Sequence, residues 1–243
     1  MAKNGLWIWY ENRLPTNYLE RISASGCRKV YLKVLDDASR PIFWDFNCTE
    51  SIINGFEASG IEVWAWGYVF DRRNSTDIPA ILNAIRNALD RGCKGFIFDI
   101  EREVENPATH LELEQLLTAA KEIVPTDGLG YTSFGHPGFH PNIPWQMLNS
   151  YCDLQFPQMY FEHWTFGGSN VEEVNRAIAA HQRLNLTKPI LPIWSSEPMA
   201  PQPATIEELN QFLERYEGSS IWRAPNVNEA GHGYHLSYND TDN

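Results

Sequence analysis

The stretch GFIFDIERE, residues 95–103, joins an apolar strand candidate to a run of acids. Residues 96–98 (FIF) are apolar without a break, as in parallel strands that are covered on both faces. Acids follow at alternate positions, as Asp99, Glu101 and Glu103. Because side chains alternate between the faces of a strand, Asp99 and Glu101 should point the same way, with α-carbons roughly 6.5–7 Å apart.

Two carboxyl groups this close together favour one shared proton. Both cannot ionise freely, so one of them is expected to have a raised pKa. A raised pKa is what a general acid needs in order to hold its proton near neutral pH. The stretch therefore predicts a catalytic carboxyl pair, and the alternative is a strand that runs out into a solvated acidic loop.

Similar short apolar runs lie on both sides of this stretch and alternate with helical patterns. Besides the acidic strand, strands are predicted at residues 5–10, 29–35, 62–70, 128–135, 153–161, 189–194 and 219–225. Helical spacing is clear over residues 78–89 and 113–124, and Ser169 with Glu172 and Thr205 with Glu208 are capping boxes that open two further helices.

The alternation predicts an α/β protein with a single (β/α)8 barrel, a TIM barrel. Eight strands, each but the last followed by a helical segment, are typical of that fold. A doubly wound open sheet is the alternative, but it usually carries a glycine-rich loop after its first strand, where this chain reads ENRLP. We expect one domain over residues 1–243, with a loosely held polar tail from about residue 226.

The composition argues against several classes of partner. The 243 residues carry a net charge of −12, which disfavours nucleic acid and membrane surfaces. No apolar run is long enough for membrane insertion. The sequence leaves the oligomeric state unknown.

The N-terminus and the cysteines predict the compartment. The N-terminus lacks a signal-peptide pattern, so we expect cytoplasmic synthesis, with release by another factor if the substrate lies outside the membrane. The four cysteines, with no CxxC pair, are interpreted as free thiols in a reducing compartment.

A TIM barrel places its active site at the carboxyl ends of its strands. Lys33 should point into the barrel and need an acid there, with Asp99 and Glu101 the nearest, unless its side chain reaches out to water. Gln158 and Tyr160 share a face of the sixth strand, where a tyrosine with a solvated hydroxyl would also be ordinary core.

Aromatic residues and one proline-rich loop are further candidates at these strand ends. Trp194 and Trp222 end neighbouring strands and could form the bottom of a pocket, although core packing is the commoner role of such tryptophans. The loop HPGFHPNIPW, which starts at His136, is either a stiff wall for sugar rings or a cover for the barrel rim. The histidines show no HxH or HExxH spacing, and no GxSxG, Walker or dinucleotide motif occurs, so neither a metal nor a cofactor is expected.

The sequence resembles glycoside hydrolase families 18 and 25, the chitinase-like and lysozyme-like barrels. GFIFDIE resembles their fourth-strand motif, which ends in DxE, QMY resembles the tyrosine-bearing strand of family 18, and Trp222 resembles its pocket tryptophan. The longer pattern, including VYLKV and PQMYF, is similar to bacterial and phage barrels usually assigned to cell-wall hydrolysis. Family 18 has further aspartates upstream where Lys94 and Ile97 stand here, and family 25 has a short Asp-containing motif where this chain reads WIWYE.

The resemblance implies roles for three residues. Glu101 would protonate the glycosidic oxygen, Asp99 would hold the 2-acetamido group that attacks the anomeric carbon, and Tyr160 would orient that group. Glu103 has no assigned step. The residues expected to contact the substrate are Lys33, Glu103, Tyr131, His136, Gln158, Glu162, Trp194 and Trp222.

The leading hypothesis is a retaining glycosidase acting on β-linked N-acetylhexosamine glycan, with peptidoglycan favoured over a chitin-like polysaccharide as the substrate. Without a signal peptide, it would suit a phage endolysin released by a holin-type route, or a hydrolase carried in a virion. The alternatives are a non-catalytic glycan-binding or structural barrel of a phage-like particle and a glycosidase acting on neutral plant or algal sugars.

Overall fold

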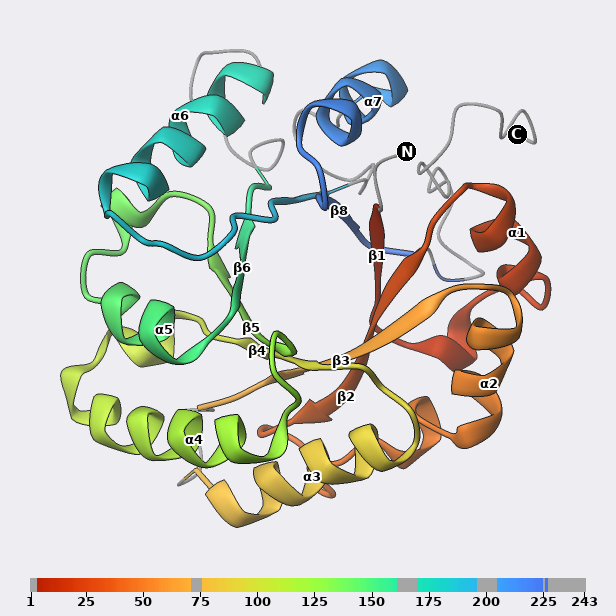
Figure 1. The fold of residues 1–243 in the computed structure, drawn as a ribbon, viewed down its shortest axis with the longest axis horizontal. Coiled ribbons are helices and arrows are strands. Elements are labelled where there is room, and N and C mark those ends of the chain that lie inside the picture. Colours follow the sequence, from red (N-terminus) through yellow and green to blue (C-terminus); the bar gives the residue numbers. More distant parts are fainter. Residues whose placement is uncertain (1–3, 71–75, 161–169, 196–204, 225, 227–243) are drawn as a thin grey trace.

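The computed structural model describes residues 4–70, 76–160, 170–195, 205–224 and 226. They form a closed barrel in which neighbouring strands pair in parallel and follow one another in chain order (Figure 1). The strands are β1 (Gly5–Ile8), β2 (Lys29–Asp36), β3 (Glu62–Tyr68), β4 (Phe96–Asp99), β5 (Leu129–Phe134), β6 (Leu154–Gln158), β7 (Ile193–Ser195) and β8 (Ser220–Trp222). The predicted TIM barrel is confirmed.

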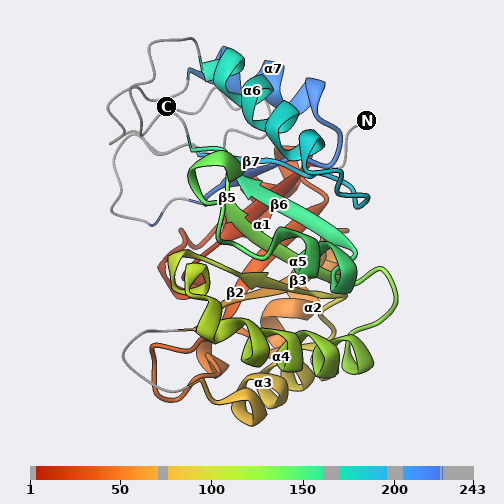
Figure 2. The same cartoon turned by 90° about the vertical axis from the view of Figure 1, so that its left-hand side faces the viewer.

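Helices surround the barrel (Figure 1). The α-helices are α1 (Tyr18–Ala24), α2 (Glu50–Ala58), α3 (Ile78–Asp90), α4 (His110–Ile123), α5 (Trp145–Tyr151), α6 (Asn170–Arg183) and α7 (Ile206–Arg215). Short 3-10 helices follow several strands: η1 (Glu11–Arg13), η2 (Asp45–Asn47), η3 (Arg102–Glu105), η4 (Pro107–Thr109) and η5 (Pro137–Phe139). Figure 2 shows α3 and α4 lying side by side along the barrel wall.

Local sequence signals account for where the helices begin and end. Helix α7 opens with the predicted capping box, in which Thr205 and Glu208 bond each other's backbone N–H groups. Helix α3 is capped by Asp77 and followed by Gly92, whose φ of +109° favours glycine. Ser169, the expected cap of α6, lies outside the described residues.

Strands β6 and β7 are shorter than the sequence predicts. Strand β6 ends at Gln158, and within the described ranges its one register pair with β7 joins Gln158 to Ile193. The expected seventh strand started at residue 189, but Ile190 makes only an isolated bridge, and Pro192 has no N–H to donate to a ladder. This side of the barrel is therefore held by fewer strand hydrogen bonds than the β2–β3 side.

The strands separate two cores. The larger core lies between the strands and the helices, and the smaller one fills the barrel interior. We call the interior cluster the floor; its buried members are Trp7, Tyr31, Trp64, Trp66, Ile97, Phe156 and Ile193. Glycines make room for these rings: a Cβ on Gly5 would lie 2.3 Å from the Tyr31 ring, and one on Gly130 would lie 2.9 Å from the Phe156 ring.

Two predictions about composition can be compared with the structure. All four cysteines are buried and free, as expected. Of the helices in the described ranges, none combines the length and apolar character needed to cross a bilayer.

Candidate active site

A cleft of about 250 Å³ lies at the carboxyl ends of the strands, above the floor. Its lining residues are Trp7, Trp66, Asp99, Glu101, Thr132, Gln158, Tyr160, Ile193 and Trp222. Five of the residues singled out from the sequence therefore meet in one place, namely Asp99, Glu101, Gln158, Tyr160 and Trp222.

Asp99 and Glu101 line this cleft together. Asp99 is the last residue of β4 and is 9% exposed. Glu101 precedes η3 with an extended backbone (φ −118°, ψ −157°), so the alternation of the strand continues for two more residues. The side-chain amide of Gln158, from β6, donates to Asp99 Oδ1 at 3.0 Å and also hydrogen-bonds the Glu101 carboxylate. The prediction that the two acids share a face is confirmed.

The surroundings raise the pKa of both carboxyl groups. For Asp99, burial raises the pKa well above its usual value, and the Glu101 charge raises it further, against the opposing effects of Lys33 and Gln158. For Glu101, burial is again the largest cause and the Glu103 charge the second, with the same two groups opposing. A protonated carboxyl group at near-neutral pH is what proton donation requires.

Aromatic rings form the sides and bottom of the cleft. Trp222 lies at the end of β8, with its ring centroid 6.1 Å from that of Tyr160 and 5.7 Å from that of Trp66. The Trp66 indole N–H is directed at two carbonyl oxygens, those of Ile8 at 3.3 Å and Tyr31 at 3.1 Å, which fixes the ring. Fixed apolar rings beside carboxyl and amide groups suit a ligand with flat apolar faces and polar edges.

Lys33 points inward, but its ion-pair partner differs from the expected one. Its ammonium lies 2.8 Å from Asp36 Oδ2, on the same strand, instead of pairing with Asp99 or Glu101. Its side chain is only 5% exposed, so it does not reach out to water. The prediction overlooked Asp36 because it considered only acids on other strands.

Two of the expected substrate contacts lie on the outer face of the barrel. Tyr131 is 2% exposed in the larger core and donates its hydroxyl to Gln155 Oε1 at 3.2 Å, so its neighbour Thr132 faces the cleft instead. Trp194 packs against Phe212 of α7, with ring centroids 5.1 Å apart. The period-2 alternation of strands sends these two side chains away from the acids.

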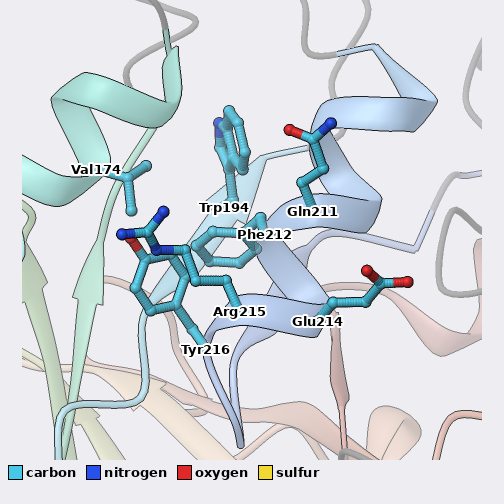
Figure 3. A pocket seen from close by; sticks show the side chains of 7 residues that line it. All are labelled: Val174, Trp194, Gln211, Phe212, Glu214, Arg215 and Tyr216. Carbon is cyan, nitrogen blue, oxygen red and sulfur yellow. The ribbon is translucent and has the colours of Figure 1, made fainter.

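Trp194 instead borders a second hollow, of about 390 Å³, outside the barrel. Figure 3 shows Trp194 between Val174 of α6 and side chains of α7, including Phe212 and Arg215. This hollow is larger than the cleft, but neither Asp99 nor Glu101 lines it. The smaller cleft, which both acids line, is therefore the candidate active site.

Two further expected contacts, His136 and Glu103, lie in the segments that follow β5 and β4. His136 precedes η5 and stacks on Phe139 with ring centroids 4.5 Å apart, and burial lowers its pKa. His136 does not line the cleft. Glu103 lies in η3 and acts on Glu101 through its charge. Glu162 lies outside the described residues.

Sequence reasoning missed Asn47, which joins the ends of two strands. Its side-chain amide donates to the carbonyl oxygens of Trp9 at 3.0 Å and Lys33 at 2.6 Å, and its Oδ1 accepts from the Glu11 N–H at 2.6 Å. The side chain is completely buried. A single asparagine at the end of a short 3-10 helix gives no local signal of this role, whereas Trp66 and Thr132 could have been found by counting alternate residues from the ends of their strands.

In the described part of the chain, no three His, Cys, Asp or Glu side chains come together in a way that could hold a metal ion. Comparison by sequence finds no family model and no curated protein that matches this chain. Comparison by structure finds many matching chains.

Three solved structures illustrate the likeness. The family 18 chitinase ChiB from Flavobacterium johnsoniae has a TM-score of 0.64 and 10% identity, over 92% of this chain and 88% of that one. The spore cortex-lytic enzyme SleL from Bacillus megaterium has a TM-score of 0.58 and 11% identity, over 97% and 72%. A putative deoxyribose-phosphate aldolase from Coccidioides immitis has a TM-score of 0.57 and 9% identity, over 92% and 81%.

At such low identity, the likeness concerns the fold alone. The chain is a TIM barrel, an architecture that it shares with glycoside hydrolases and with barrels of other chemistry.

Proposed function

We propose that this protein is a glycosidase that cleaves β-linked N-acetylhexosamine glycan, with peptidoglycan as its substrate. The observation that carries the proposal is the pairing of Asp99 and Glu101 in a cleft with aromatic walls at the carboxyl end of the barrel. Chitinases and a spore cortex-lytic enzyme share this fold, which supports a glycan substrate.

Glu101 is the proton donor in this scheme. It is the less deeply buried of the two acids and can reach a ligand, while its raised pKa keeps the proton available. It protonates the glycosidic oxygen as the bond from that oxygen to the anomeric carbon breaks. The resulting carboxylate later takes a proton from the water that attacks the same carbon, so Glu101 is regenerated.

Asp99 assists the attacking group, which belongs to the substrate. In substrate-assisted hydrolysis, the oxygen of the 2-acetamido group forms a bond to the anomeric carbon as the leaving group departs. Asp99 accepts a hydrogen bond from the acetamide N–H, and Tyr160, which lines the same cleft, orients that group. Gln158 keeps the Asp99 carboxyl group in place, and Trp222 packs against a sugar face. The attacking water then breaks the bond between the acetamido oxygen and the anomeric carbon and restores the acetamide, so two inversions at one carbon retain its configuration.

The first experiment measures release of reducing ends from purified peptidoglycan and from chitin. Wild type is compared with Glu101→Gln, which keeps the size of the side chain and removes the transferable proton. Glu112→Gln is the matched control, because Glu112 is exposed on α4, outside the cleft. We expect Glu101→Gln to lose at least ~10²-fold in kcat/KM and the control to retain the wild-type value.

Two results would contradict this proposal. One is a wild type that releases no reducing ends from either polymer, and the other is an active Glu101→Gln variant. Binding of glycan by wild type and Glu101→Gln alike, without turnover, would instead favour the non-catalytic glycan-binding barrel.

The route to the cell wall is a separate part of the proposal. An enzyme of this kind would act as a phage endolysin released by a holin-type route or as a hydrolase carried in a virion. Expression with and without a holin, followed by optical density as cells lyse, tests the first route. Lysis that needs no holin would contradict it.

A further inference from the structure

Lys33 and Asp36 form a nearly enclosed ion pair beside the catalytic acids. The distance from Lys33 Nζ to Asp36 Oδ2 is 2.8 Å, and the exposed fractions of the two side chains are 5% and 16%. The other carboxyl oxygen of Asp36 accepts the N–H of Ala38 at 2.9 Å. A buried charge needs compensation from its surroundings. The ion pair compensates both charges, and the bond from Ala38 fixes the Asp36 carboxylate.

Three tryptophans surround the ammonium group. Lys33 Nζ lies 5.1 Å from the ring centroid of Trp9, 4.7 Å from that of Trp44 and 5.1 Å from that of Trp66. These rings exclude water from Lys33 and favour its positive charge through cation–π attraction. A charge in such a place acts on its neighbours with little screening.

Register connects this ion pair to the acids. Asp36 pairs with Tyr68, Tyr68 with Asp99, and Asp99 with Thr132, so the four residues form one row across β2 to β5. Lys33 lies one layer below this row and reaches up to it. Asp36 and Lys33 consequently act on Asp99 with opposite signs: the Asp36 charge raises the pKa of Asp99, and the Lys33 charge lowers it.

We propose that Lys33 and Asp36 are positioning residues whose opposed charges set how many protons the Asp99–Glu101 pair holds at the working pH. Lys33 permits the pair to lose one proton despite its burial, and Asp36 prevents the loss of both. The inference deepens the proposed function, on which its consequence for hydrolysis rests. The titration of the two acids does not depend on that function.

Two other groups also shift the pKa values of Asp99 and Glu101. Glu103, in η3, raises the pKa of Glu101 through its charge. Gln158, from β6, is neutral and stabilises both carboxylates through hydrogen bonds. The charge of Lys33 lowers the pKa of both acids. Removing it should therefore move both titrations in one direction.

The experiment uses Lys33→Met, Asp36→Asn and the double variant. Carbon-13 NMR of labelled Asp and Glu side chains follows the titration of Asp99 and Glu101 without any substrate. The pH profile of kcat/KM on peptidoglycan follows its consequence for catalysis. Lys94→Met is the matched control, because Lys94 forms a surface ion pair with Glu57 and does not line the cleft.

The expected shifts have opposite signs. Lys33→Met should raise the pKa values of the acid pair by about 1 unit and move both limbs of the pH profile upward, since an opposite charge has been removed. Asp36→Asn should move them downward, because Lys33 is then uncompensated. The double variant should lie close to wild type, and Lys94→Met should not differ from it.

A role in packing alone would give a different pattern. Shifts of Lys33→Met and Asp36→Asn in the same direction, or lost activity with unchanged carboxyl titrations, would overturn the inference. Should Lys33→Met fail to fold, Asp36→Asn decides: a downward shift supports the inference and no shift overturns it. Opposed titration shifts in a protein without hydrolytic activity would uphold this inference and contradict the proposed function.

Discussion

The floor and the mouth of this barrel belong to the same strands but have opposite chemistry. The mouth consists of Asp36, Asp99, Glu101 and Gln158, and Lys33 reaches up to it from the layer below. One two-residue step leads from Ile97 to Asp99 on β4 and from Phe156 to Gln158 on β6. Such a step covers roughly 7 Å, so charged groups lie directly above a dry aromatic cluster.

The contrast shows how the fold raises the pKa of the carboxyl groups at the mouth. The floor offers the acids no water from below, and burial is accordingly the largest cause of the raised pKa of both Asp99 and Glu101. We expect packing of the floor to raise the free energy of unfolding. We expect burial of charged groups at the mouth to lower it, as is common where a protein carries reactive groups. Substitutions on either side can test this division.

The largest effect on stability is expected at Phe156, in the floor. Phe156→Ala should lower the free energy of unfolding by about 3–5 kcal/mol, because the ring is 1% exposed and its removal leaves a cavity. Gln158→Ala, two residues further along the strand, should lower it by only about 1 kcal/mol, the typical net value of a hydrogen bond. Urea unfolding measures both, and equal losses would contradict the division.

A smaller loss is expected when the floor is overfilled. Gly130→Ala places a methyl group 2.9 Å from the Phe156 ring and 3.3 Å from Ile97 Cγ1, and should cost about 1–3 kcal/mol in urea unfolding. The control is Gly55→Ala in α2, where the nearest atom is the flexible end of Leu19 at 3.2 Å. The control should change stability by less than about 1 kcal/mol, because alanine favours helix. If Gly130→Ala proves as mild as the control, the floor is not tightly packed.

The smallest effect is a gain in stability, at the mouth. The raised pKa of folded Asp99 means that the unfolded chain releases this proton at a lower pH than the folded protein. Stability is therefore lost as the pH rises above about 4, the unfolded value. Asp99→Asn should avoid this loss and be more stable than wild type at pH 8, by roughly 0.5–2 kcal/mol, while losing activity.

Thermal unfolding of Asp99→Asn and wild type at pH 8 and pH 4 tests this prediction. At pH 4 the advantage should shrink, because the carboxyl group is then largely protonated in the folded protein and partly so in the unfolded chain. An Asp99→Asn variant that is less stable than wild type at pH 8 would show that the mouth carries no such cost.

Much of the fold could be predicted from local patterns. Alternating strand and helix signals predicted the barrel, the Thr205 capping box and the common face of Asp99 and Glu101, because each depends on residues close together in the chain. The ends of β6 and β7 were wrong. Their lengths depend on how many backbone groups meet across neighbouring strands, and no single strand carries that information.

The candidate site was predicted in part, for the same reason. The predicted strand ends indicated Asp99, Gln158 and Trp222 as site residues, and these three side chains do meet in the cleft. The face on which Tyr131 and Trp194 lie depends on register, and a change of one residue sends a side chain from the cleft into the helix layer.

By itself, the sequence determined that an acid pair ends a buried strand and that seven further strands surround it, because periodicity and alternation are properties of neighbouring residues. Only the tertiary structure decided that Lys33 pairs with Asp36 among three tryptophans, that Asn47 joins the ends of two strands and that Gln158 bridges to the acids. These contacts join segments whose meeting depends on closure of the barrel, which no stretch of chain encodes alone.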